Sequence, residues 1–267
     1  MAATRKITIL DFARMKDEGR KIVVITAYDV VFAGIFDDAG VDAILVGDSL
    51  GQVVLGLPNT LGVTMDDMVR HTGAVARGRK RALLIADMPF LSFQAGTEDA
   101  IRNAGRLLQA GAEAVKLEGG RNVEATIRAI AASDIPVMGH VGLTPQSIHR
   151  MGGYRIQGKA EAQRARLLDD AQAVQEAGAF AVVLEGMPSD LAAEITARLE
   201  IPTIGIGAGA RCDGQVLVMQ DLLGLLEEFR PKFVKRFGEL AKPVSEAVKA
   251  YAEEVRGGTF PGKEHSF

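Results

Sequence analysis

The chain of 267 residues contains one cysteine, Cys212, and no tryptophan. A single cysteine excludes a disulfide within the chain and a zinc site built from several thiolates. No apolar run reaches the length of about 18 residues that predicts a membrane-spanning helix. The N-terminal MAATRKITIL also lacks the apolar core of a signal peptide. We therefore expect a cytoplasmic protein with no membrane partner.

An excess of basic charge is missing as well. Lys and Arg number 31 against 34 Asp and Glu, so the net charge is -3. No cluster of basic residues is interleaved with aromatic residues, which excludes a general affinity for nucleic acid. Apolar residues make up 48% and charged residues 24% of the chain, as in ordinary globular proteins. A chain of this length predicts a single domain over residues 1–267.

Eight short apolar runs alternate with longer amphipathic stretches. The runs are rich in Val and Ile and too short for most helices, which is typical of strands covered on both faces. Eight such strands with helices between them predict an α/β fold, a single-domain (β/α)8 TIM barrel. Residues from about 240 to 267 are predicted to add a C-terminal helix and tail. The predicted strands are 21–26, 42–47, 82–87, 114–118, 135–140, 180–185, 201–207 and 215–219.

One phrase occurs three times: AGVDAILVGDS, AGAEAVKLEGG and AGAFAVVLEGM. Each copy has Ala-Gly, a short apolar run and then an acidic residue: Asp48, Glu118 or Glu185. The Ala-Gly pair is typical of a helix end followed by a turn into a strand. That interpretation accounts for the glycines and leaves the acidic residues unexplained.

The carboxyl ends of the strands in a parallel barrel meet at one rim, where active sites are built. A single acidic residue at such a position is usually a helix N-cap or a loop residue. Five titratable groups at one rim favour a common site instead. The five are Asp48, Asp87, Glu118, His140 and Glu185.

Strand alternation adds a lysine to this set. Lys116 and Glu118 share one face of strand 114–118, and a charged residue on the helix-covered face would be buried without a partner. We therefore expect both at the barrel mouth, either as part of the site or as a structural ion pair. Glu185 shares its face with Ala181 and Val183. Apolar surroundings raise the pKa of a carboxylate, as a general base requires, although a rim acid bonded to loop amides is the alternative.

Oxygen ligands without cysteine suit a hard cation such as Mg²⁺, which takes one or two carboxylates plus water and substrate oxygens. Asp48 and Asp87 are the two carboxylates that we expect to bind such a cation. Ser49 could donate a hydrogen bond to a substrate carboxylate. His140 is either a donor near the substrate or a core histidine.

Two glycine-rich segments resemble phosphate-binding motifs and are better explained otherwise. GYRIQGKA (153–160) has P-loop spacing, but Ala160 replaces the required Ser or Thr and no strand runs directly into it. GIGAGARCDG (205–214) lacks the spacing of the dinucleotide fingerprint and predicts a tight loop. Residues 151–164 as a whole are predicted to form a loop.

Nine stretches in order along the chain closely resemble the ketopantoate hydroxymethyltransferase family. Each stretch alone is modest evidence, whereas nine spread over nearly the whole chain are highly specific. They are ITAYD (25–29), VGDSLG (46–51), ADMPF (86–90), VKLEGG (115–120), GHVGLTPQS (139–147), GGYRIQG (152–158), LEGMP (184–188), IGIGAG (204–209) and FPGKEHSF (260–267).

The resemblance implies a barrel of the phosphoenolpyruvate/pyruvate type that transfers a hydroxymethyl group from 5,10-methylenetetrahydrofolate to 3-methyl-2-oxobutanoate. It implies one Mg²⁺ per subunit, a magnesium-stabilised enolate and a homo-oligomer, often a decamer of two pentameric rings. Asp48 and Asp87 would bind the metal, with Glu118 a direct or water-mediated ligand. Ser49 and Lys116 would contact the 2-oxo acid, and Glu185 would be the base. Together with His140, Asp48 and Asp87 complete the predicted substrate-binding set.

Two other functions remain possible from the sequence. A sister enzyme of the same barrel type, acting on a C–C or C–P bond of a 2-oxo acid, would use the same rim. A catalytically silent barrel that only binds metabolites would have no need of a poised base. A requirement for folate would distinguish the hydroxymethyltransferase reaction from that of a sister enzyme. Turnover of a substrate would distinguish an enzyme from a silent barrel.

Overall fold

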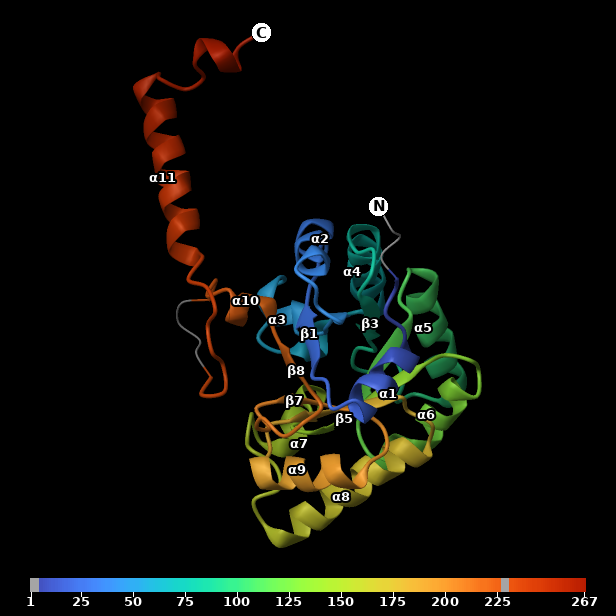
Figure 1. Ribbon diagram of the computed structural model, residues 1–267. Coiled ribbons are helices and arrows are strands. Elements are labelled where there is room, and N and C mark those ends of the chain that lie inside the picture. The colour runs from blue at the N-terminus through green and yellow to red at the C-terminus, as the bar shows by residue number, and fades with distance from the viewer. Residues whose placement is uncertain (1–4, 227–230) are drawn as a thin grey trace. The chain divides into compact units, whose positions relative to one another are not determined.

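The computed structural model describes residues 5–226 and 231–267, and the chain divides into two compact units, Met1–Val218 and Met219–Phe267. The first unit is a closed barrel of eight parallel strands in sequence order, with β8 paired to β1 (Figure 1). The predicted barrel is confirmed. The strands are β1 (Ile22–Thr26), β2 (Ala43–Val46), β3 (Leu83–Asp87), β4 (Ala114–Glu118), β5 (Val137–Gly142), β6 (Ala181–Glu185), β7 (Thr203–Ile206) and β8 (Gly214–Leu217).

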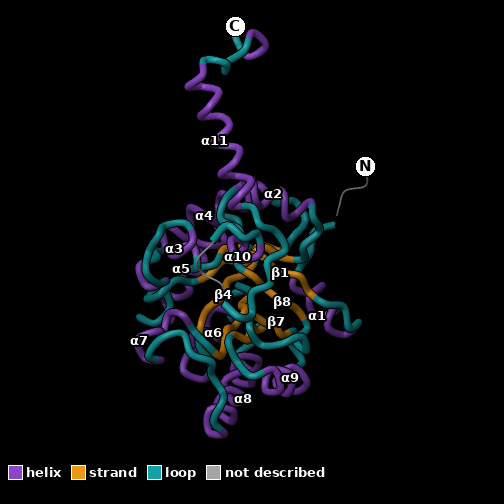
Figure 2. Tube along the Cα trace, turned by 90° about the vertical axis from the view of Figure 1, so that its left-hand side faces the viewer, coloured by secondary structure: helices purple, strands orange, loops and turns teal. Residues whose placement is uncertain are grey.

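Every predicted strand overlaps an observed one, and β5 runs two residues beyond its predicted end. Helices surround the strands, as the purple ring around the orange strands shows (Figure 2). No helix in the described ranges is long and apolar enough to cross a membrane. The helices of the first unit are α1 (Ile9–Asp17), α2 (Val30–Asp38), α3 (Leu50–Val53), α4 (Met65–Gly78), α5 (Thr97–Gln109), α6 (Glu124–Ala131), α7 (Ile148–Met151), α8 (Glu161–Glu176) and α9 (Ser189–Arg198).

Alternate residues of the strands fill the barrel interior. This follows from the two-residue period of a strand, which turns every second side chain to the same face. α1 adds Phe12 and Met15, both fully buried, to the same core, and Phe12 packs edge-to-face against Phe180 at 5.7 Å. The strand residues of this core are Ile22, Val24, Ala43, Leu45, Leu83, Ile85, Ala114, Met138, Ala181, Val183, Ile204 and Val216.

The Ala-Gly pairs are the joints between helix and strand, as predicted. α5 ends with Ala110 as its C-cap and Gly111 at φ 110°, and α8 ends with Ala177 and Gly178 at φ 96°. The same arrangement follows α2, at Ala39 and Gly40. Positive φ is strained for other residues, so the glycine lets the chain turn sharply into the next strand.

The second unit holds α10 (Met219–Leu222) and α11 (Ala241–Gly257), so the predicted C-terminal helix is confirmed. The C-cap of α11 is Gly258, which has φ 69°. Beyond it, the Phe260 ring lies between Tyr251 and His265, with centroid distances of 5.5 Å to each. The prediction of a single domain over 1–267 stays a prediction.

Close packing of α2 against α4 predicts that Gly78→Ala destabilises the barrel. A Cβ on Gly78 would lie 2.2 Å from the Val30 carbonyl oxygen, which is backbone and cannot rotate away. We expect a loss of about 1–3 kcal/mol in the free energy of unfolding. The matched control is Gly105→Ala within α5, where a Cβ would meet nothing within 4 Å.

The control variant should gain roughly 0.5–1 kcal/mol, because alanine favours the helix over glycine. Urea unfolding of both variants beside the wild type measures the difference. Equal stability of the two variants would show that α2 and α4 do not pack as described.

Candidate active site

The inward-facing rows of four adjacent strands end in polar side chains. In each of these strands the inward-facing residue after the last apolar one is polar. Ile85 is followed by Asp87 on β3, and Ala114 by Lys116 on β4. Met138 is followed by His140 on β5, and Val183 by Glu185 on β6. Glu118 follows Lys116 on the same face, and Asp48 lies two residues beyond the end of β2. These rim groups are buried, except that the Glu185 side chain is 18% exposed. The structure thus brings together all the titratable groups predicted for the rim.

Lys116 is the cation among these acids. Its Nζ lies 2.6 Å from Asp87 Oδ1, on the residue paired with it in the β3–β4 register. The direct ion-pair partner of Lys116 is therefore Asp87, and not Glu118 as in the alternative of a structural Lys116–Glu118 pair. Burial lowers the pKa of Lys116, but the charges of Asp87, Glu118 and Asp48 outweigh it and hold the pKa above its usual value. Lys116 is a permanent cation at the barrel mouth.

Lys116 also determines the state of His140. The Lys116 Nζ lies 3.2 Å from His140 Nδ1, and an ammonium can only donate a hydrogen bond, so Nδ1 accepts. Burial, followed by the charge of Lys116, lowers the pKa of His140, so the imidazole is neutral with its proton on Nε2. That atom lies 3.1 Å from Glu185 Oε2, without the alignment of a full hydrogen bond. His140 therefore lies as a polar link between Lys116 and Glu185, and its role as a donor near the substrate stays a prediction.

Gln146 was not predicted, and it contacts two of the acids. Its side-chain amide donates to Asp48 Oδ2 at 2.8 Å and to the Met88 carbonyl at 3.0 Å. Its backbone N–H donates to Glu118 Oε2 at 3.0 Å. The residue lies in the short 3-10 helix Pro145–Ser147 that follows β5. The sequence signal that could have identified it is the glutamine two residues after the threonine in GHVGLTPQS.

Two further hydrogen bonds orient the first acids. The Asp48 N–H donates to Asp87 Oδ2 at 3.0 Å, so both oxygens of Asp87 have a partner. The Tyr28 hydroxyl and the Ser49 hydroxyl are 2.9 Å apart, and Tyr28 is buried. Burial raises the pKa of Tyr28, so it remains a neutral phenol. Tyr28 is a second contact that sequence reasoning missed, although it lies within the ITAYD stretch.

Negative charge exceeds positive charge at this rim. Burial and then the charge of Asp87 raise the pKa of Asp48 to about 7, and burial and then the charge of Asp48 raise the pKa of Glu118 well above its usual value. Buried carboxylates with one lysine to balance them suit a divalent cation. Among the described residues, no three His, Cys, Asp or Glu side chains form a ready-made metal cage. Mg²⁺ typically takes one or two carboxylates and completes its shell with water and substrate oxygens.

Both glycine-rich segments are connections between elements of the barrel unit. Residues 153–160 connect α7 to α8, and residues 205–214 connect β7 to β8. The predicted loop 151–164 is shorter than expected, because α8 begins at Glu161.

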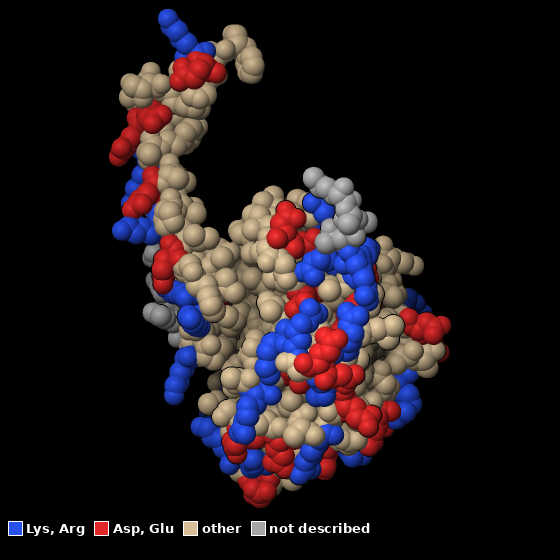
Figure 3. Space-filling model, viewed as in Figure 1, with Lys and Arg blue, Asp and Glu red and all other residues tan. Residues whose placement is uncertain are grey.

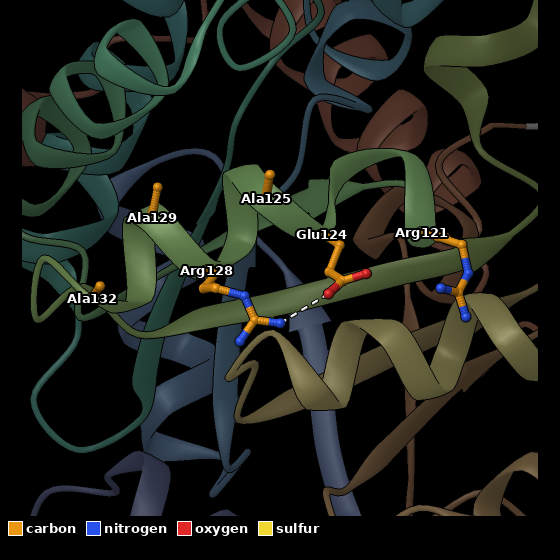
Figure 4. A pocket seen from close by; sticks show the side chains of 6 residues that line it. All are labelled: Arg121, Glu124, Ala125, Arg128, Ala129 and Ala132. Atoms are coloured by element: carbon orange, nitrogen blue, oxygen red, sulfur yellow. Dashed lines mark hydrogen bonds and ion pairs between the residues drawn. The ribbon is translucent and has the colours of Figure 1, made fainter.

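A hollow of about 520 Å³ lies apart from the rim acids. It runs along α6 on the outside of the barrel (Figure 4) and contains none of the titratable rim groups. The Arg128 and Glu124 side chains in it form an ion pair at 2.8 Å. Such a surface hollow offers no chemistry comparable to the rim.

Comparison with known proteins finds one family. The chain matches the family described as ketopantoate hydroxymethyltransferase over residues 6–263. It is 62% identical over 264 residues to the 3-methyl-2-oxobutanoate hydroxymethyltransferase of Pelobacter propionicus, covering 98% of each chain. It is also 62% identical over 264 residues to that of Geobacter sulfurreducens, covering 98% of this chain and 99% of the relative.

Solved structures give the same fold. Phosphonopyruvate hydrolase in complex with oxalate and Mg²⁺ superposes with a TM-score of 0.62, covering 96% of this chain and 92% of that one. The two chains are 16% identical, so this likeness concerns the fold alone.

The raised pKa of Asp48 predicts a pH dependence of stability in the metal-free protein. In the unfolded chain the pKa of Asp48 lies near its usual value of 3.8, whereas in the folded chain it lies at about 7. Between these values the folded state holds the extra proton, so the free energy of unfolding falls as pH rises. Asp48→Asn should flatten this slope by up to about 1.4 kcal/mol per pH unit.

Denaturant unfolding in EDTA at pH 5, 6 and 7 measures the slope. The control is Asp38→Asn, which changes a carboxylate whose side chain is 74% exposed and should leave the slope unchanged. The same slope in Asp48→Asn and wild type would contradict the proposed ionisation of Asp48.

Proposed function

Because the chain belongs to the ketopantoate hydroxymethyltransferase family, a family of enzymes, we propose that it makes 2-dehydropantoate (ketopantoate) for pantothenate and coenzyme A biosynthesis. The substrate is 3-methyl-2-oxobutanoate, and the hydroxymethyl group comes from 5,10-methylenetetrahydrofolate. The observation that carries the proposal is the rim itself, where Lys116 lies among buried carboxylates and His140 links it to Glu185. The family match favours this reaction over the sister chemistries of the same barrel type.

Asp48 and Asp87 would hold Mg²⁺, with Glu118 beside it as a direct or water-mediated ligand. Bound there, Mg²⁺ would act as a Lewis acid towards the keto and carboxylate oxygens of the substrate. Hydrogen bonds orient the carboxylates for this role in advance. Gln146 occupies one oxygen of Asp48 and one of Glu118, which directs their other oxygens elsewhere.

The remaining polar groups would bind the 2-oxo acid. Lys116 supplies positive charge for an anionic substrate, because it keeps its proton in this environment. Ser49 would donate its hydroxyl hydrogen to the substrate carboxylate, and the Tyr28 hydroxyl would then donate to the Ser49 oxygen, 2.9 Å away. His140 completes the substrate-binding set with its Nε2 proton directed to the Glu185 side.

Glu185 would be the general base. It is more exposed than the other rim acids, with 18% of its side chain accessible, so a substrate can reach it. His140 Nε2 beside Glu185 Oε2 restricts the carboxylate without neutralising it. Glu185 would remove the C3 proton, and the resulting enolate carbon would form the new C–C bond to the methylene carbon of the donor, with Lys116 near the developing oxyanion. The two C–N bonds of that carbon would break to leave tetrahydrofolate, and water would supply the hydroxyl oxygen of the product.

The setting of the enzyme is also part of the proposal. We expect it to act in the cytoplasm, without nucleic-acid or membrane partners. A homo-oligomer, with the decamer of two pentameric rings as the specific expectation, remains a prediction from the family resemblance.

Glu185→Gln should abolish enolisation. The amide has nearly the shape of the carboxylate but cannot accept the C3 proton, so exchange should fall by at least about 100-fold. The measurement is deuterium uptake at C3 of 3-methyl-2-oxobutanoate in D₂O by NMR, with Mg²⁺ and without folate. Oxo-acid affinity should change far less than the exchange rate.

Glu200→Gln is the matched control, since Glu200 is exposed and lies outside the rim. It should exchange at the wild-type rate, and EDTA should stop exchange in both proteins. Near-normal exchange in Glu185→Gln would identify another group as the base. If the wild type shows neither exchange nor ketopantoate formation after folate is added, the proposed reaction is wrong.

A further inference from the structure

The connection from β5 to α8 carries unpaired positive charge. We call residues 148–160, IHRMGGYRIQGKA, the basic loop. It contains Arg150, Arg155 and Lys159, has no acidic residue, and exposes all three cations. None of the three forms an ion pair with any acid in residues 5–226 or 231–267. Over the face of the barrel unit in Figure 3, by contrast, acidic and basic side chains are interspersed.

One end of the basic loop is attached beside the proposed base. The Gln157 N–H donates to the carbonyl of Gly186 at 2.8 Å, and Gly186 directly follows Glu185 at the end of β6. Gly158 is buried with φ 84°, and a Cβ there would lie 2.5 Å from the Leu191 side chain of α9. Packing and a backbone hydrogen bond therefore hold this part of the loop at the rim.

The middle of the basic loop reaches the opposite side of the barrel mouth. The Tyr154 hydroxyl lies near the side chain of Gln52 of α3, which follows β2. Burial, opposed by the nearby Gln52 side chain, raises the pKa of Tyr154, and the charges of Asp48, Glu185 and Glu118 raise it further. In this eight-stranded barrel β2 and β6 lie opposite each other, so the loop has neighbours on both sides of the mouth. Tyr154 is nevertheless 51% exposed, and Ile156 is 53% exposed.

This combination suits a planar, anionic ligand that arrives over the acids. An exposed aromatic ring can stack on a flat heterocycle, and exposed cations can pair with carboxylates that the rim itself would repel. The methylenetetrahydrofolate donor has both parts, a pterin and aminobenzoyl ring system and a glutamate tail. Solvated loop charges without a ligand are the simpler alternative, and they predict no effect on either substrate.

Building on the function proposed above, we propose that the basic loop is the binding site for the one-carbon donor. The rings of the donor lie against Tyr154, and its glutamate carboxylates pair with Arg150, Arg155 and Lys159. The 2-oxo acid makes no contact with these three cations.

The first test removes the three charges together in Arg150→Gln, Arg155→Gln and Lys159→Gln. The control variant carries Arg20→Gln, Arg77→Gln and Lys80→Gln, an equal change of charge on residues that are exposed and not at the carboxyl ends of strands. In the loop variant, KM for methylenetetrahydrofolate should rise on the order of tenfold, and more for a polyglutamylated donor with its extra carboxylates. KM for 3-methyl-2-oxobutanoate and folate-free deuterium exchange at C3 should stay within about twofold.

The second test concerns the ring. Tyr154→Leu should raise KM for the donor by about threefold to tenfold, whereas Tyr154→Phe keeps the ring and should stay near the wild type. An unchanged donor KM in the triple loop variant, or an equal rise in the control variant, would overturn the proposal. A rise in both substrates' KM together with slower exchange would show that the loop supports the rim instead.

Failure of the loop proposal and failure of the proposed function give different results. If the wild type forms ketopantoate and the loop variants keep the wild-type donor KM, only the loop proposal is wrong. If the wild type exchanges deuterium at C3 but transfers nothing from methylenetetrahydrofolate, the donor assignment and the loop proposal both fail.

Discussion

The site depends on the pairing of one buried ammonium, Lys116, with Asp87 on the neighbouring strand. Taking a charge out of water costs several kcal/mol, so an isolated lysine or aspartate at this depth would be neutral or would not be buried at all. The pair at 2.6 Å makes both charges tolerable, and His140 then accepts from the same lysine. The position of Lys116, the cation that would bind the substrate, and that of the neutral His140 imidazole both follow from that contact.

Strand geometry makes this arrangement reachable from the sequence. The apolar runs predicted the strands, and alternation predicted that Lys116 and Glu118 face the mouth, because each continues the row begun by Ala114. The repeated Ala-Gly phrase placed acids at equivalent strand ends, which a parallel barrel brings to one rim. For these reasons the fold and the rim groups could be predicted before any contact was known.

The contacts between strands could not be predicted in the same way. Whether Lys116 pairs with Asp87 or Glu118 depends on the stagger between β3 and β4, and a single sequence carries no direct signal of that stagger. Gln146 and Tyr28 were missed because they act through hydrogen bonds to residues distant in the sequence. β5 ended later than predicted because Gly142, with φ 103°, still pairs with Glu185 across the sheet.

Excess negative charge is the feature that joins the geometry to the chemistry, and it gives the most direct test. Under the proposed function, the rim carboxylates need a divalent cation before the anionic 2-oxo acid can bind. Isothermal calorimetry of 3-methyl-2-oxobutanoate with the wild-type protein, in Mg²⁺ and in EDTA at pH 8, measures this coupling. We expect binding in Mg²⁺ and an affinity at least about tenfold weaker in EDTA, a coupling of about 1.4 kcal/mol or more. Equal affinity in the two buffers would contradict the account.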